Sequence, residues 1–127
     1  MANTITKNVI SNGPRNLTIE VHISGDASGD ETAYSLVDVS AYSAAEVKIM
    51  SIQSNLGGFS AVLRWDATTD VEAIKLLDGA SFYDFNSIGG LPNNAGAGKT
   101  GDILMATDSL GSEDGSFIIE MKKRLAS

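Results

Sequence analysis

The sequence predicts an all-β domain, an antiparallel β-sandwich or barrel-like fold built from short strands. Two observations support this prediction. Apolar and polar residues alternate in several short segments, a period that is typical of strands with one buried face. Turn-forming residues, among them 13 glycines, separate these segments at short intervals, and that spacing is typical of sandwiches and barrels.

The length of the chain predicts a single domain. It has 127 residues, and dividing them between two cores would leave both halves too small to be stable. Hydrophobic residues make up 43% of the chain and charged residues 20%, which is ordinary for a globular protein. We therefore expect one β domain over residues 1–127, with residues 1–10 free to act as an extended arm.

The clearest strand covers residues 17–24, where apolar residues occupy every second position: Leu17, Ile19, Val21 and Ile23. A turn at Gly13-Pro14 separates it from a weaker strand over residues 4–10, because glycine frees and proline fixes the backbone angle φ. The acidic segment 25–31 follows. Its composition offers nothing for a core, so we expect a surface loop.

Further strands are predicted over residues 32–39, 47–54, 59–65, 71–77, 81–85, 102–107 and 116–124. The short turns between residues 47 and 77 predict a meander of adjacent strands. Residues 89–101 form a long glycine-rich loop. Two helical alternatives, a single turn at 43–46 and an amphipathic helix over 69–77, are too short to compete with their flanking turns.

The residue inventory favours no catalytic chemistry. The chain has no cysteine, which excludes disulfides and thiolate chemistry and removes the usual ligands of structural zinc. Its one histidine, His22, lies on the polar face of a predicted strand. No Gly-x-Ser-x-Gly elbow presents a serine nucleophile. We therefore expect no enzyme, with no catalytic residue, no metal site and no cofactor.

Two segments resemble binding loops in part. Residues 96–100 look like the end of a phosphate-binding loop, but Asn93 stands where the first glycine is required and no helix follows. Residues 26–31 place oxygen ligands at alternate positions, as calcium loops do, yet lack the glycine and the later glutamate of such loops. A solvated turn is the preferred interpretation, and weak calcium binding stays an alternative.

Four aromatic residues would suit a sugar-stacking platform: Trp65, Phe82, Tyr83 and Phe85. Their alternation within strands suits core packing better, and Trp65 continues the face of Ala61 and Leu63. Phe82 and Phe85 fall on opposite faces of their strand, so we expect one of the two to be exposed.

Charge and hydropathy argue against two classes of partner. The net charge of −7 repels phosphate backbones, and the one basic run, residues 122–124, is interpreted as a solvated or edge-protecting strand end. No stretch reaches membrane-spanning length, and the N-terminal residues lack the features of a secretory signal. We expect synthesis in the cytosol, no nucleic-acid partner and no membrane partner.

Four segments in the second half of the chain resemble small structural proteins of tailed bacteriophages. They cover residues 62–71, 85–91, 100–104 and 117–123. The resemblance implies a virion component, most naturally a decoration or cement protein that binds the outer surface of the capsid. Its partner would be the major capsid protein, and a homo-oligomer, with a trimer favoured, would multiply weak contacts. A neck, tail or fibre component is one alternative, and a carbohydrate- or calcium-binding β module is another.

Two segments are the predicted contacts with the capsid, because neither looks committed to a core and both can order on binding. The first is the N-terminal segment and the second is the glycine-rich loop. The residues expected to make these contacts are Ile5, Val9, Ile10, Leu91, Pro92, Asn93 and Asn94.

Overall fold

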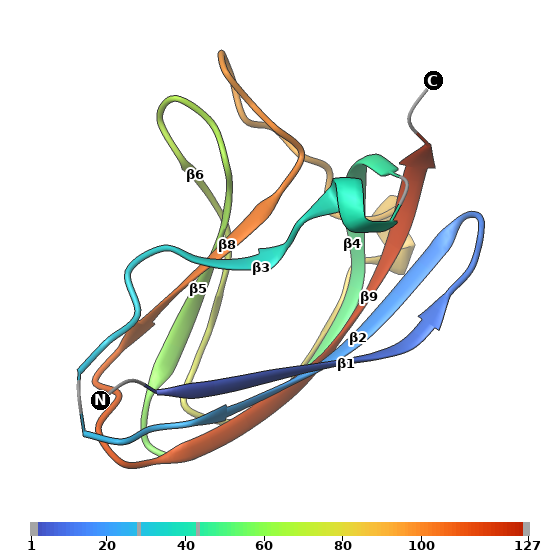
Figure 1. Ribbon diagram of the computed structural model, residues 1–127. Helices are drawn as coiled ribbons and strands as arrows, with labels where there is room; N and C mark the ends of the chain where they lie inside the picture. Colours follow the sequence, from blue (N-terminus) through green and yellow to red (C-terminus); the bar gives the residue numbers. More distant parts are fainter. Residues whose placement is uncertain (1–2, 28, 43, 126–127) are drawn as a thin grey trace.

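A computed structural model describes residues 3–27, 29–42 and 44–125 (Figure 1). In this part of the chain no helix is long and apolar enough to cross a membrane. The elements are strands and two short 3₁₀ helices, in the order β1 (Thr4–Asn12), β2 (Asn16–Ser24), β3 (Tyr34–Val37), η1 (Val39–Tyr42), β4 (Ala44–Leu56), β5 (Ser60–Trp65), β6 (Val71–Leu76), β7 (Gly79–Asp84), η2 (Asn86–Ile88), β8 (Ile103–Asp108) and β9 (Asp114–Leu125).

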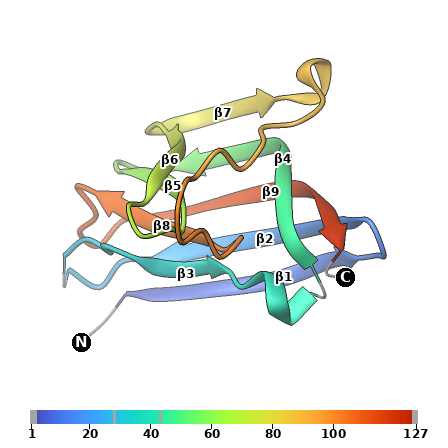
Figure 2. The ribbon, with the colours of Figure 1, turned by 90° about the horizontal axis from the view of Figure 1, so that it is seen from above.

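The strands form two antiparallel sheets that face each other (Figures 1 and 2). The five-stranded sheet has the order β1-β2-β9-β4-β7, and the four-stranded sheet has the order β3-β8-β5-β6. Apart from β1, this is the eight-stranded jelly-roll order, in which most connections cross from one sheet to the other. The predicted all-β antiparallel sandwich is therefore confirmed.

Each segment predicted as a strand contains one, and β6 occupies the segment for which a helix was the alternative. The predicted meander is wrong. β4 lies in the five-stranded sheet, whereas β5 and β6 lie in the four-stranded sheet. Alternation shows that a strand has one apolar face, but two facing sheets satisfy that pattern as well as one extended sheet does.

The core lies between the sheets. The apolar residues of β2 are completely buried, in the alternation that the sequence predicts. Trp65 from the four-stranded sheet and Phe117 from the five-stranded sheet are each 1% exposed. Burying a side chain of this size contributes about 1.5–3 kcal/mol, so the large side chains of both inner faces hold the layers together.

Strand β9 lies in the centre of its sheet. It pairs with β2 over residues 114–122 on one side and with β4 over residues 115–125 on the other. The basic residues 122–124 therefore do not protect an edge, and that alternative is wrong. Lys122 and Arg124 are exposed, which agrees with the other alternative, a solvated strand end. The order of strands in a sheet depends on pairing across the whole chain, which a local charge run does not reveal.

Residues 4–12 pair with β2 and so lie along the sheet rather than projecting from it. Lys7 on β1 reaches across to the other sheet. Its Nζ donates to the carbonyl oxygens of Ser35 (3.2 Å) and Leu36 (3.1 Å) and lies 5.5 Å from the centre of the Tyr34 ring, within the range of a cation–π contact. Lys7 thus links β1 to β3 along the side of the sandwich.

The glycine-rich loop is tied to the domain, contrary to the prediction that it is uncommitted. Leu91 exchanges two backbone hydrogen bonds with Ile49 (2.8 and 3.1 Å) and packs against the core. Farther along, Thr100 donates from its backbone N–H (3.1 Å) and its hydroxyl (2.8 Å) to Asp66. Leu91 and these polar contacts hold both ends of the loop, and a count of glycines does not show them.

Candidate functional site

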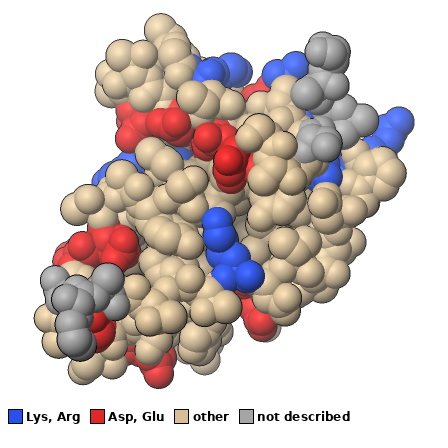
Figure 3. Space-filling view, viewed as in Figure 1, with Lys and Arg blue, Asp and Glu red and all other residues tan. Residues whose placement is uncertain are grey.

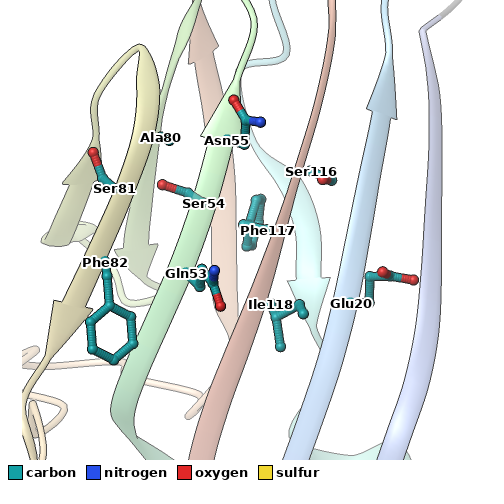
Figure 4. A pocket seen from close by; sticks show the side chains of 10 residues that line it. All are labelled: Glu20, Gln53, Ser54, Asn55, Ala80, Ser81, Phe82, Ser116, Phe117 and Ile118. Carbon is teal, nitrogen blue, oxygen red and sulfur yellow. The ribbon is translucent and has the colours of Figure 1, made fainter.

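The outer face of the five-stranded sheet carries a row of side chains that runs across all five strands. The pairing register places Asn8, Glu20, Ile118, Gln53 and Phe82 opposite one another in turn. Figure 4 shows four of them in line across β2, β9, β4 and β7. Because alternate residues of a strand point to opposite faces, this row lies on the side away from the core.

Phe82 is the exposed aromatic residue of the row, with 65% of its surface accessible. Phe85 is half-buried and packs against the core, so the prediction that one of the two is exposed is confirmed. Trp65 is buried, and the hydroxyl of Tyr83 accepts the N–H of Leu77 (3.3 Å). Of the four aromatic residues considered for a platform, Phe82 is the one fully available to a ligand.

A hollow of about 500 Å³ lies beside Phe82. Gln53 and Asn55 are exposed there, and within the described residues neither amide has a protein hydrogen-bond partner. The residues that line the hollow are Glu20, Gln53, Ser54, Asn55, Ala80, Ser81, Phe82, Ser116, Phe117 and Ile118. One aromatic ring beside several hydrogen-bonding groups is a common composition for a small-ligand site.

Asp84 adds a negative charge on the same face of β7. Its carboxylate accepts hydrogen bonds from the backbone N–H (2.9 Å) and the side-chain amide (2.6 Å) of Asn86. These two bonds favour the charged form and hold the pKa of the carboxyl below its ordinary value. The margin of the face near Phe82 therefore stays anionic to lower pH than a free aspartate would.

A second hollow, of about 310 Å³, lies near the end of β9. It brings together two features that are far apart in the sequence, the glycine-rich loop and the basic run. Its lining residues are Glu46, Val47, Lys48, Gly89, Pro92, Asn93, Lys122, Lys123 and Arg124. The predicted contacts Pro92 and Asn93 thus share a surface with the strongest concentration of positive charge that the sequence contains.

The other predicted contacts lie elsewhere. Ile5 is half-buried and packs against the core. Val9 and Ile10 are 43% and 53% exposed on the edge strand β1. Asn94 is exposed and lines neither hollow. The seven residues therefore do not form one surface.

The acidic loop uses its carboxylates inside the protein. Asp30 accepts hydrogen bonds from the hydroxyl of Thr107 (3.1 Å) and from the backbone N–H groups of Ser109 (3.3 Å) and Leu110 (2.7 Å). These donors occupy the oxygens that calcium would need. Among the residues described, no three metal-binding side chains come together, so the geometry gives the calcium alternative no support.

His22 and the glycine-lysine segment have ordinary positions. His22 is exposed on the outer face between Thr6 and Ser116. The segment 96–100 leads into β8 rather than into a helix, and Lys99 lies 3.6 Å from Glu46. A phosphate-binding loop needs a helix N-terminus at this point, so the segment resembles such a loop in sequence but not in structure.

Comparison with known proteins finds only distant structural similarity. No protein-family model and no curated protein matches the chain. KdgF from Halomonas sp. is 10% identical, with a TM-score of 0.42 over 94% of this chain and 81% of that one. A cupin superfamily protein from Desulfitobacterium hafniense is 10% identical, with a TM-score of 0.36 over 97% and 80%. The family 11 carbohydrate-binding module of a Clostridium thermocellum cellulase is 14% identical, with a TM-score of 0.37 over 100% and 86%.

These comparisons correct one prediction. The prediction that the chain is not an enzyme is wrong, because cupin-fold enzymes, KdgF among them, are among the solved structures that it is similar to. A strand-only domain without cysteine gives no ground for excluding catalysis, since activity depends on the site and not on the fold. The similarity is distant, with TM-scores of 0.36–0.42, and it does not show catalysis by this chain. None of these structures is phage-related, so the virion role stays a prediction.

Proposed function

We propose that the chain is a saccharide-binding β module whose ligand lies on the outer face of the five-stranded sheet. The observation that carries the proposal is Phe82, exposed to 65% beside a hollow that amide and hydroxyl groups help to line. Covering a large exposed apolar side chain with a ligand removes its apolar surface from water, which favours binding at such a position.

The chemistry of the row suits a sugar. The C–H groups of a pyranose ring carry partial positive charge and pack on the electron-rich face of an aromatic ring. The hydroxyls of a sugar both donate and accept hydrogen bonds. The side-chain amides of Gln53 and Asn55 can accept from them and donate to them, and the carboxylate of Glu20 can accept from them. The row crosses three strand spacings from Phe82 to Glu20, roughly 14 Å, which offers space to a short oligosaccharide.

The test is affinity electrophoresis of the full chain in gels that contain one soluble neutral polysaccharide each, followed by calorimetry with oligosaccharides of the retained polymer. We expect Phe82→Ala to weaken binding by about 2- to 12-fold, because the loss of an aromatic contact costs roughly 0.5–1.5 kcal/mol. Leu77→Ala is the matched control, since Leu77 is 55% exposed but does not line the hollow. Retention that is unchanged in Phe82→Ala, or reduced equally in both variants, would contradict the proposal.

A second candidate function rests on the edge strand β1. We propose, as the alternative, a phage capsid decoration protein that attaches through this edge. Val9 and Ile10 are both exposed there, and β1 ends its sheet, so its outer backbone groups can pair with a strand of another subunit. The sequence resemblance to phage structural proteins supports the same role, and a homotrimer would bring three such edges to one capsid position.

Co-sedimentation with expanded and unexpanded capsids of the cognate phage tests this alternative. We expect saturable binding to the expanded shell, and we expect Val9→Lys to weaken it, because a lysine charge on an edge disfavours strand addition. Sedimentation velocity of the free protein measures the oligomer. An absence of binding to both shells would eliminate the capsid role.

A further inference from the structure

Two lysines lie directly opposite each other on the outer face of the five-stranded sheet. The register pairs Lys48 on β4 with Lys122 on β9, and side chains so placed have Cβ atoms about 5 Å apart. Both residues are exposed, and the described part of the chain offers neither an ion pair nor a hydrogen bond. Like charges in this arrangement destabilise a sheet, so an anion bound between the two ammonium groups would relieve their repulsion.

The acid within this hollow is already engaged. Glu46 Oε1 accepts a hydrogen bond from Arg124 Nε (2.8 Å) and forms an ion pair with Arg124 Nη2 (2.7 Å), and Glu46 Oε2 lies 3.6 Å from Lys99 Nζ. Glu120 precedes Lys122 by two residues on the same face but does not line the hollow. Nothing that lines the hollow therefore remains to balance the two lysines.

The hollow concentrates positive charge in an acidic protein. Four of the chain's nine lysines and arginines line it, against one acid, whereas the whole chain has a net charge of −7. Figure 3 shows basic side chains around the end of the molecule where β9 finishes, and acidic side chains more widely over the rest of that face. One of the four, Lys123, donates to Asn12 and to the carbonyl oxygen of Tyr42 (2.8 Å), which leaves Lys48 and Lys122 for a ligand.

Asn93 adds a neutral donor at the same place. Its Oδ1 accepts the backbone N–H of Ala95 (3.0 Å), which fixes the orientation of the amide. Its Nδ2 is buried and has no partner. Buried polar atoms normally have a hydrogen-bond partner, so this N–H group remains available to an acceptor bound from outside the chain.

The loop that carries Asn93 is packed onto Lys48, one member of the lysine pair. Gly90 has a φ of +100°, and a Cβ at this residue would lie 2.7 Å from Met50 Sδ and 3.1 Å from Lys48 Cβ. The backbone of the loop therefore rests on the root of the Lys48 side chain, which a residue larger than glycine would prevent. This contact fixes Asn93 and Lys48 in one place.

We propose that Lys48, Lys122 and Asn93 form an oxyanion site, which takes a sulfate, phosphate or carboxylate group. The two ammonium groups supply the charge, and the Asn93 amide supplies a directed hydrogen bond. The site uses none of the residues around Phe82, so it stands whether or not the proposed saccharide site does. The oxyanion is either free in solution or attached to a saccharide, and the chemistry of recognition is the same.

The test is a titration of the full ¹⁵N-labelled chain with sodium sulfate, with sodium chloride adjusted to keep the ionic strength constant. We expect saturable shifts of the Asn93 side-chain amide resonances and a rise in Tm with sulfate, because a ligand that binds the folded state stabilises it. Lys122→Gln should weaken sulfate binding at least tenfold. Lys75→Gln is the control, because Lys75 is an exposed lysine of the other sheet and its loss should leave binding unchanged.

A second variant separates loss of the site from loss of the fold. Lys48→Glu replaces the like-charge pair by an opposite-charge pair, so we expect a higher Tm at low salt together with the loss of sulfate binding. A variant that had simply lost structure would show a lower Tm.

The source of the oxyanion is distinguished with sulfated dextran, unsulfated dextran of the same length and inorganic sulfate. Tighter binding of sulfated dextran than of inorganic sulfate would identify a polymer-borne group, and equal affinity would identify the free anion. The proposal is overturned if sulfate and chloride act alike on the native chain, or if Lys122→Gln and Lys75→Gln lose binding equally.

Discussion

Two hydroxyls are buried in opposite states of hydrogen bonding, and this difference predicts opposite effects of removing them. Ser54 on β4 is 3% exposed and its Oγ has no partner among the described residues. Thr107 on β8 is 8% exposed, and its Oγ1 accepts the N–H of Glu31 (2.8 Å) and donates to Asp30 (3.1 Å). Ser54→Ala and Thr107→Val each remove one buried hydroxyl with little change in shape.

The magnitudes follow from what each change leaves behind. Thr107→Val leaves the N–H of Glu31 without its acceptor and removes one of the two donors to Asp30 Oδ1, which keeps the N–H of Leu110. Stranding a buried polar group costs about 1–3 kcal/mol. Ser54→Ala strands nothing and removes a group whose desolvation is uncompensated, so we expect the free energy of unfolding to rise by about 1 kcal/mol.

Urea unfolding measured by the fluorescence of Trp65 gives both values, and an unchanged m-value shows that the comparison is between similar folded and unfolded states. In thermal unfolding, a change of about 1 kcal/mol corresponds to about 3–5 °C in a chain of this length. The reasoning fails if Ser54→Ala loses as much stability as Thr107→Val, because the Ser54 hydroxyl would then have a partner.

Three further predictions concern other parts of the molecule. Gly101→Ala should lower the free energy of unfolding by about 2 kcal/mol or more, because φ is +89° and the new Cβ would lie 2.1 Å from a backbone oxygen. Gly79→Ala, at φ +97° in open space, should lower it by only about 1 kcal/mol. The denaturant midpoints of the two variants test this difference. Trp65→Ala should cost about 3–5 kcal/mol, because the side chain is buried; since Trp65 is the chain's one tryptophan, urea unfolding of this variant and of the native chain is followed by circular dichroism. The Asp84 carboxyl should titrate below 3.8 by NMR and return towards it in Asn86→Ala. The hydrogen bonds from Asn86 to the Asp84 carboxylate, which order η2, should therefore be present above the ordinary pKa of an aspartate. They should be lost as the pH falls through the lowered pKa of Asp84.

The alternation of apolar and polar residues was enough to predict the strands, because the polarity of each residue indicates whether its face of the strand is buried or exposed. The alternation of residues 17–24 predicts both the strand β2 and its buried face, and both are observed. In β4 the same rule reaches its limit. The register shifts between Ile49 and Ser51, and Ser51 and Ile52 are consecutive buried residues. A β-bulge changes which residues face inward, and no local signal in the residues marks where it falls.

Pairing between distant segments was not predictable, and both hollows depend on it. The opposition of Lys48 and Lys122 follows from β9 lying beside β4. Gln53 and Phe82 read as ordinary solvent-facing residues of two separate strands until the register places them side by side. Alternation does predict that such residues point away from the core, so the sequence could have identified the members of the outer face but not their neighbours.

The central place of β9 sets the order in which the molecule can fold. Asn16 pairs with Lys122, and Ala44 pairs with Leu125, so the five-stranded sheet stays in two halves until the last strand docks between them. The entropy cost of closing loops of this length comes before the stabilising contacts form, so folding is slow, on the scale of milliseconds to seconds. During that interval β2 and β4 each present an open edge, and a second unfolded chain can supply β9 in place of the chain's own. Exchange of β9 between copies is therefore the misfolding route to which this topology is most exposed.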